Sequence, residues 1–106
     1  MFTITHMSPV TLPDDHPSQI PWNQWPEKFT QSHLIELDKP HTIGGKSSAP
    51  SGDLFRLYDD DGNLYAQGMI ALDDDDDGFE PLDWAMGNWG CTEIRYHTPG
   101  KGWVTL

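Results

Sequence analysis

The chain has 106 residues, of which 36% are hydrophobic, and its formal net charge is −11. This length suits one domain, 1–106, and no apolar run approaches the roughly 20 residues that a membrane-crossing helix needs, which predicts no membrane span. The negative charge disfavours direct binding to nucleic acid and to anionic lipid, because both repel it.

The acidic charge is concentrated in one part of the sequence. Residues 53–93 contain 12 acidic residues and one basic residue, so this stretch carries 12 − 1 = 11 net negative charges. The rest of the chain balances five acidic residues against five basic ones. The sequence therefore divides into a neutral Pro-rich arm and loop, 1–52, and an acidic half, 53–106.

The first residues, 1–7, alternate apolar and polar side chains, which predicts a short strand. Five prolines follow between residues 8 and 27. Proline fixes φ and donates no backbone hydrogen bond, so this segment is expected to be an irregular arm. Within it, Pro21 is placed to open one helical turn over residues 20–25.

A second strand is predicted over residues 29–37, where Leu34, Ile35 and Leu37 are apolar, with Pro40 as its end. The segment 44–52 is rich in glycine, serine and proline and is typical of an exposed loop.

The acidic half begins with a predicted hairpin. Residues 54–58 and 64–72 have strand patterns, and the intervening Asp-Asp-Asp-Gly-Asn sequence tolerates the positive φ of a tight turn. Gly68 interrupts the second strand and suggests a bulge.

A short helix over residues 81–86, stopped by Gly87, leads to a second hairpin formed by residues 91–97 and 102–106. The expected fold is mainly β or small α+β: two antiparallel hairpins with a short helix and an irregular Pro-rich N-terminal arm.

The acidic residues are candidates for binding a basic protein surface. A dense row of carboxylates imitates the phosphate charge of nucleic acid, and opposite charges steer association. Trp22 and Trp25 are added because Trp is enriched at binding hot spots, whereas Trp84, Trp89 and Trp103 are expected in the core. The sequence leaves open whether the acidic loops share one face. The acidic candidates are Asp59, Asp60, Asp61, Asp73, Asp74, Asp75, Asp76, Asp77, Glu80 and Asp83.

Calcium binding is an alternative. Asp73, Asp75 and Asp77, followed by Gly78, match the opening of a calcium-binding loop, in which alternate carboxylates converge on one ion. The match fails at the twelfth loop position, which is Trp84 instead of glutamate. No other cofactor is indicated.

An enzyme of unrecognised type is the remaining alternative. The chain has no established catalytic motif, and Cys91 and His97 would lie about 20 Å apart along an extended strand. The protein is therefore expected not to be an enzyme. Cys91 is the one cysteine and is expected to be a small buried residue, which together with the absence of a signal-peptide pattern predicts a cytoplasmic location.

Three segments of the acidic half carry a family resemblance: residues 55–62 (FRLYDDDG), 79–83 (FEPLD) and 90–96 (GCTEIRY). They resemble small uncharacterised acidic proteins of bacteria and of their phages and plasmids. The resemblance implies a prokaryotic or phage origin and implies no activity.

Overall fold

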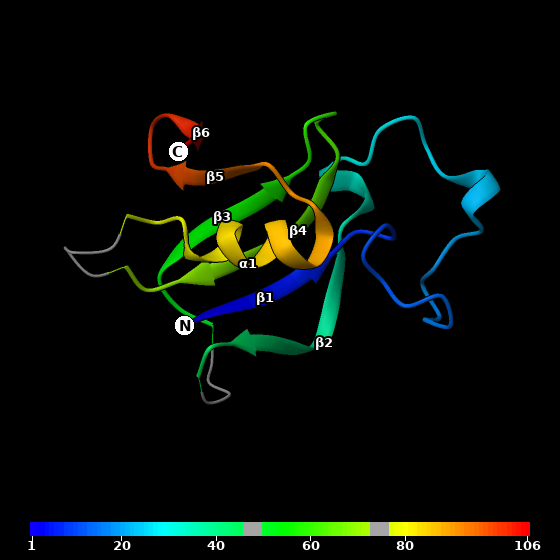
Figure 1. Cartoon of the computed structure of the whole chain (residues 1–106), viewed down its shortest axis with the longest axis horizontal. Coiled ribbons are helices and arrows are strands. Elements are labelled where there is room, and N and C mark those ends of the chain that lie inside the picture. Colours follow the sequence, from blue (N-terminus) through cyan, green and yellow to red (C-terminus); the bar gives the residue numbers. More distant parts are fainter. Residues whose placement is uncertain (46–49, 73–76) are drawn as a thin grey trace.

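The computed structural model describes residues 1–45, 50–72 and 77–106, which form a six-stranded antiparallel sheet and one α-helix (Figure 1). The fold is mainly β, as predicted. The strand order across the sheet is β2-β1-β4-β3-β5-β6. The elements in chain order are β1 (Phe2–Met7), the 3-10 turns η1 (Trp22–Gln24) and η2 (Gln31–His33), β2 (Ile35–Ile43), β3 (Asp53–Tyr58), β4 (Leu64–Ile70), α1 (Glu80–Trp89), β5 (Glu93–Thr98) and β6 (Gly102–Thr105).

Both predicted hairpins are confirmed, as β3–β4 and β5–β6. The strand predicted over residues 1–7 is confirmed as β1, which lies inside the sheet between β4 and the edge strand β2. The arm predicted over residues 8–27 is longer than expected, because β2 begins only at Ile35. The irregular arm is thus residues 8–34, broken only by η1 and η2. Leu12 and Phe29 anchor it, since both are buried.

The core lies between the sheet and α1, which crosses one face of it (Figure 1). The period-two alternation of β3 points Phe55 and Leu57 into this layer, where both are fully buried. The Phe2 ring meets the Phe55 and Trp84 rings edge to face, at centroid distances of 5.9 and 5.8 Å. Trp84 and Trp89 pack against this core as predicted. Trp103 does not belong to it.

Gly68 does not form the bulge that its position in β4 suggested. The register irregularity between β1 and β4 falls between Ile4 and His6 of β1, opposite Gly68 and Gln67, and the one between β3 and β4 falls between Leu57 and Tyr58. Gly68 instead marks a close approach: a Cβ atom there would lie 2.2 Å from the Thr3 carbonyl oxygen. Glycine at this position lets β1 and β4 pair at their observed distance.

The strand predicted over residues 29–37 is wrong in its bounds. β2 begins at Ile35, runs through Pro40 and ends at Ile43. Proline is tolerated there because β2 is an edge strand with an irregular register opposite β1. The preceding residues form η2, where the Thr30 hydroxyl and the His33 ring complete a capping box.

The helix is longer than predicted. α1 runs from Glu80 to Trp89, with Pro81 in its first turn and Gly87 inside it, and ends at Gly90, whose φ is 76°. The positive φ places Gly90 in the left-handed conformation that commonly ends a helix. Within the described residues, no helix has the length and apolar character needed to cross a membrane.

Candidate functional site

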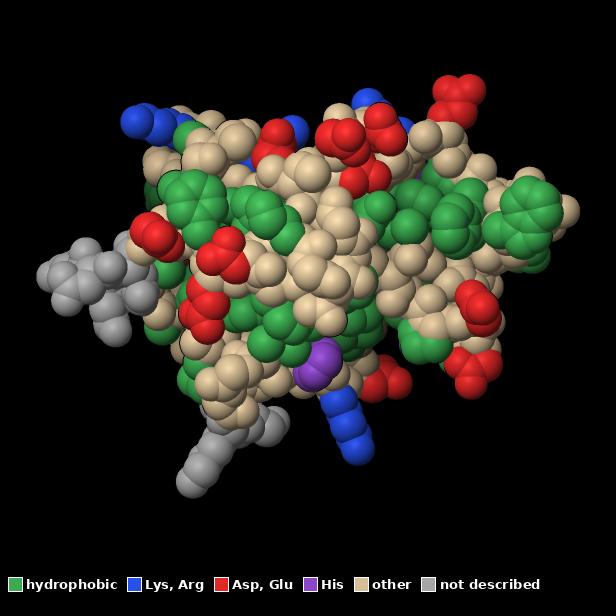
Figure 2. All heavy atoms as spheres, viewed as in Figure 1, with side chains coloured by type: hydrophobic (Ala, Val, Ile, Leu, Met, Phe, Trp, Pro, Cys, Tyr) green, Lys and Arg blue, Asp and Glu red, His purple; other side chains and the backbone are tan. Residues whose placement is uncertain are grey.

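The acidic candidates fall into two groups at opposite ends of the β3–β4 hairpin. Asp59, Asp60 and Asp61 lie in the turn that joins the two strands. At the other end, Asp77 borders the same groove as Asp53, which pairs with Ile70 and was not among the predicted candidates. Figure 2 likewise shows acidic side chains in separate groups around the visible face. The described carboxylates therefore do not share one patch. Asp73, Asp74, Asp75 and Asp76 lie outside the described residues.

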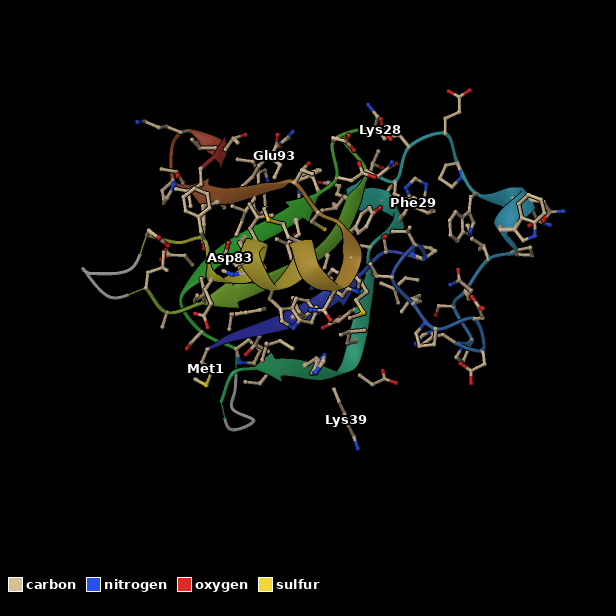
Figure 3. All side chains as sticks on the ribbon, in the orientation of Figure 1. Met1, Lys28, Phe29, Lys39, Asp83 and Glu93 are labelled. Carbon is tan, nitrogen blue, oxygen red and sulfur yellow. The ribbon has the colours of Figure 1, made fainter. Side chains whose placement is uncertain are left out.

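We call the second group the acidic end: Asp53, Asp77, Glu80 and Asp83. All four side chains are exposed, and Figure 3 shows Asp83 beside the start of α1. Glu80 accepts two hydrogen bonds from the N-terminal ammonium, at 2.8 and 3.0 Å. Among the described residues, no lysine or arginine forms an ion pair with any of these carboxylates. Glu80 is thus paired with a cation, whereas Asp53, Asp77 and Asp83 present negative charge to solvent with no ion pair among the described residues.

The acidic end borders a groove of about 400 Å³. Its two carboxylates, Asp53 and Asp77, stand beside an apolar lining that includes Leu72 and Leu106, which are 36% and 50% exposed. The full lining is Asp53, Leu72, Asp77, Gly78, Tyr96, His97, Thr98, Pro99 and Leu106. Carboxylates at an apolar groove suit a ligand with an aliphatic stem and a cationic head, such as a lysine or arginine side chain.

Hydrogen bonds fix the wall of this groove. The Tyr96 hydroxyl donates to the Gly78 carbonyl at 2.7 Å, and the Phe79 amide donates to Asp77 Oδ1 at 3.0 Å. Gly78 has a φ of 82°, which favours glycine, and a Cβ atom there would lie 3.0 Å from Leu106. The segment that leads into α1 is thus held against β5 and the last residue of the chain.

The apolar half of the groove was not predicted from the sequence. Leu72, Tyr96 and Leu106 belong to three separate segments, and sheet pairing and the chain's return past Gly78 bring them together. No local pattern around any one of these residues signals a groove. Of the two groove carboxylates, Asp77 was among the predicted acidic candidates and Asp53 was not.

The Asp59 turn is explained by its own hydrogen bonds. Asp59 Oδ1 accepts from the Asp61 and Asn63 amides at 3.0 and 2.8 Å, and Oδ2 accepts from Asn63 Nδ2 at 3.1 Å. Ligand atoms of Asp59, Asp60 and Asp61 lie within 4.8 Å of one another. Because Asp59 already supplies its oxygens to the turn, the hairpin accounts for this cluster.

These contacts shift two pKa values. Burial by itself raises the pKa of Asp59, but hydrogen bonds from Asn63, Tyr65 and Asp61 outweigh it and lower the pKa below its ordinary value. Burial, followed by the nearby Asp59 charge, raises the pKa of the Tyr65 phenol to about 12. Asp59 is therefore held ionised and Tyr65 neutral at pH 7.

Replacing Asp59 with alanine is expected to lower the free energy of unfolding at pH 7 by about 1–2 kcal/mol, because the turn amides lose their acceptor. The lowered pKa means that this stabilisation is present above the unfolded-state value near 3.8 and is lost as pH falls through the folded-state value. Urea unfolding at pH 6 and pH 3 should show the difference between variant and wild type shrinking at the lower pH. An equal difference at both would contradict the assignment.

The predicted calcium set is described only in part. Asp77 lies at the acidic end, and its Oδ1 atom accepts the Phe79 amide. Asp73 and Asp75 lie outside the described residues. Calcium binding by Asp73, Asp75 and Asp77 therefore stays a prediction.

Both arginines of the chain lie on the sheet face opposite α1 and are engaged there. Arg56 stacks 4.0 Å from the centroid of the Trp103 ring and donates to Gln67 Oε1 at 2.8 Å and Gln31 Oε1 at 3.1 Å. Arg95 lies 4.1 Å from the centroid of the Tyr58 ring and pairs with Glu93. Neither arginine neutralises the acidic end.

The aromatic candidates and the cysteine differ in exposure. Trp22 is 81% exposed and Trp25 is 39% exposed, on the arm. Cys91 is buried, as predicted, and burial raises the pKa of its thiol to about 12, with a further contribution from the Asp59 charge. A buried neutral thiol is a poor nucleophile, so Cys91 has a packing role.

The fold and the acidic end define a small antiparallel β domain with one covering helix and an exposed carboxylate-lined groove. Comparison with known protein families, with curated proteins and with solved structures finds no match for this chain.

Proposed function

We propose that this protein is a non-enzymatic acidic binding module that docks on a basic surface of another protein through its acidic end. The proposal rests on exposed, unpaired carboxylates beside an apolar groove. Asp53, Asp77 and Asp83 form no ion pair among the described residues, while Glu80 pairs with the N-terminal ammonium. Two of these carboxylates border the groove that exposes Leu72 and Leu106.

Charge and apolar area contribute differently to such docking. The carboxylates raise the rate of encounter with a basic surface and exclude acidic partners. The exposed leucines and Tyr96 supply apolar area that leaves water when a partner's aliphatic stems cover it. A lysine or arginine that enters the groove uses both, because its stem contacts the leucines while its head meets Asp53 or Asp77.

The sequence next to Asp77 adds further negative charge. Asp77 directly follows four further aspartates, residues 73–76. Consecutive carboxylates repeat negative charge along the chain, as phosphates do along a nucleic acid. The favoured partner is therefore a protein whose basic surface otherwise grips nucleic acid, with this chain as its inhibitor or competitor.

Affinity capture from the source cell tests this function. The intact tagged protein is used at salt concentrations of about 50 mM and about 500 mM, and bound proteins are identified by mass spectrometry. Because salt screens exposed charges, a basic protein captured at low salt should fall at least about tenfold at high salt. The proposal fails if no basic protein is enriched at low salt, or if the enriched protein is retained equally at both concentrations.

A further inference from the structure

The irregular arm carries a second candidate site, far from the acidic end. The molecule measures 44 × 29 × 27 Å along its principal axes, and Figure 1 places η1 at one end of the longest axis and the start of α1 toward the other. Figure 2 shows hydrophobic side chains at the far end of the arm. Trp22, in η1, is 81% exposed there. A ligand bound at this end of the arm would therefore be independent of docking through the acidic end.

Side-chain hydrogen bonds give this part of the arm a fixed shape. Gln19 Nε2 donates to the carbonyls of Pro9 and Leu12 at 2.7 and 3.0 Å, and Gln19 Oε1 accepts the Ile20 amide at 3.0 Å. Trp25 Nε1 donates to the Ile20 carbonyl at 3.1 Å. The arm is thus preorganised around Gln19, although it lacks regular secondary structure.

The Trp25 ring also packs on the buried Phe29 ring, edge to face, at a centroid distance of 5.4 Å. These contacts shape a pocket of about 360 Å³. It is lined by Asp14, Gln19, Ile20, Pro21, Trp22 and Trp25. Asp14 is the one charged residue of that lining, so the pocket combines indole rings with a single negative charge.

We propose that this pocket binds the side chain of an arginine from a basic polypeptide, with the guanidinium over the Trp22 ring and paired with Asp14. Trp is the aromatic side chain that attracts cations most strongly, and a planar guanidinium stacks on rings while it pairs with a carboxylate. A neutral or acidic ligand would leave Asp14 without a counter-charge.

The protein's own arginines support this choice of cation. Arg56 lies over the Trp103 ring and Arg95 over the Tyr58 ring, at 4.0 and 4.1 Å. No described arginine or lysine lies over Trp22 in the same manner. Both arginines of the chain stack on an aromatic ring. The Trp22 ring is free of such a contact among the described residues, so it can stack with an arginine from another molecule.

Nuclear magnetic resonance titration of the intact ¹⁵N-labelled protein tests the proposal. The probe is N-acetyl-arginine methylamide, and the uncharged norleucine analogue is the control. The Trp22 indole N–H signal, assigned with Trp22→Phe, should shift with the arginine probe and not with norleucine. Trp22→Ala should abolish the response of the remaining pocket signals, while the dispersed spectrum confirms folding.

Two charge variants separate a specific pair from general acidity. Asp14→Asn should weaken arginine binding about three- to fivefold. Asp15→Asn removes the same charge from a neighbouring residue that does not line the pocket, and it should weaken binding less than twofold. The inference is overturned if the Trp22 signal does not respond to arginine, if norleucine shifts it equally, or if the two variants weaken binding alike.

Discussion

Replacing Gly68 with alanine is expected to lower the free energy of unfolding by about 3 kcal/mol or more. The added Cβ would lie 2.2 Å from the Thr3 carbonyl oxygen and 2.7 Å from Phe55 Cζ. The first contact pushes on the backbone of β1, which cannot move without opening its pairing with β4. The second displaces a fully buried ring at the centre of the core.

The same chemical change at Gly87 is the matched control. Gly87 lies in α1, and a Cβ there would meet no atom within 4 Å. Because alanine favours helix over glycine, Gly87→Ala should raise the free energy of unfolding by about 0.5–1 kcal/mol. Urea unfolding of both variants measures the difference. A Gly68→Ala variant as stable as wild type would contradict the close approach of β1 and β4.

The acidic half of the fold could be predicted because its contacts are local. Residues 59–63 carry the chemistry of a tight turn, and the strands on either side pair directly with each other. The same holds for the turn after Thr98, which joins β5 to β6. Turn residues and period-two alternation determine such hairpins without information from distant segments.

The first half was harder because its pairings are long-range. β1 pairs with β4, whose partner residues lie 59 to 66 positions later in the chain, and nothing within residues 1–7 indicates that partner. Phe29 is the first residue of the strand predicted over 29–37, but hydrogen bonds to the end of the β3–β4 turn hold it outside any strand. Its amide donates to Asn63 Oδ1 at 2.9 Å, and its carbonyl accepts the Leu64 amide at 3.0 Å.

The sequence predicted the negative charge of the candidate site but not the shape of its groove. Local acidity identified Asp77, Glu80 and Asp83, because charge is a property of composition. The separation of Asp59 from Asp77 follows from the hairpin geometry. The exposure of Trp22, in contrast with the packed Trp84, depends on how Gln19 folds the arm. A local sequence pattern does not predict such tertiary contacts.

Neutralising three carboxylates of the acidic end is expected to reduce capture of the basic partner at least about tenfold at low salt. The variant Asp77→Asn, Glu80→Gln and Asp83→Asn changes the formal net charge from −11 to −8 and keeps the shape of each side chain. Asparagine at position 77 retains an oxygen that can accept the Phe79 amide, so the start of α1 should be preserved.

The most direct measurement compares this variant with a second one of the same net charge. The matched variant Glu27→Gln, Glu36→Gln and Asp38→Asn removes three exposed carboxylates away from the groove. Both variants are first shown to be as stable as wild type, and partner capture is then quantified at about 50 mM salt. The matched variant should capture an amount of partner within about twofold of wild type, whereas the acidic-end variant should lose the partner. Equal losses, or no loss for either, would contradict docking through the acidic end.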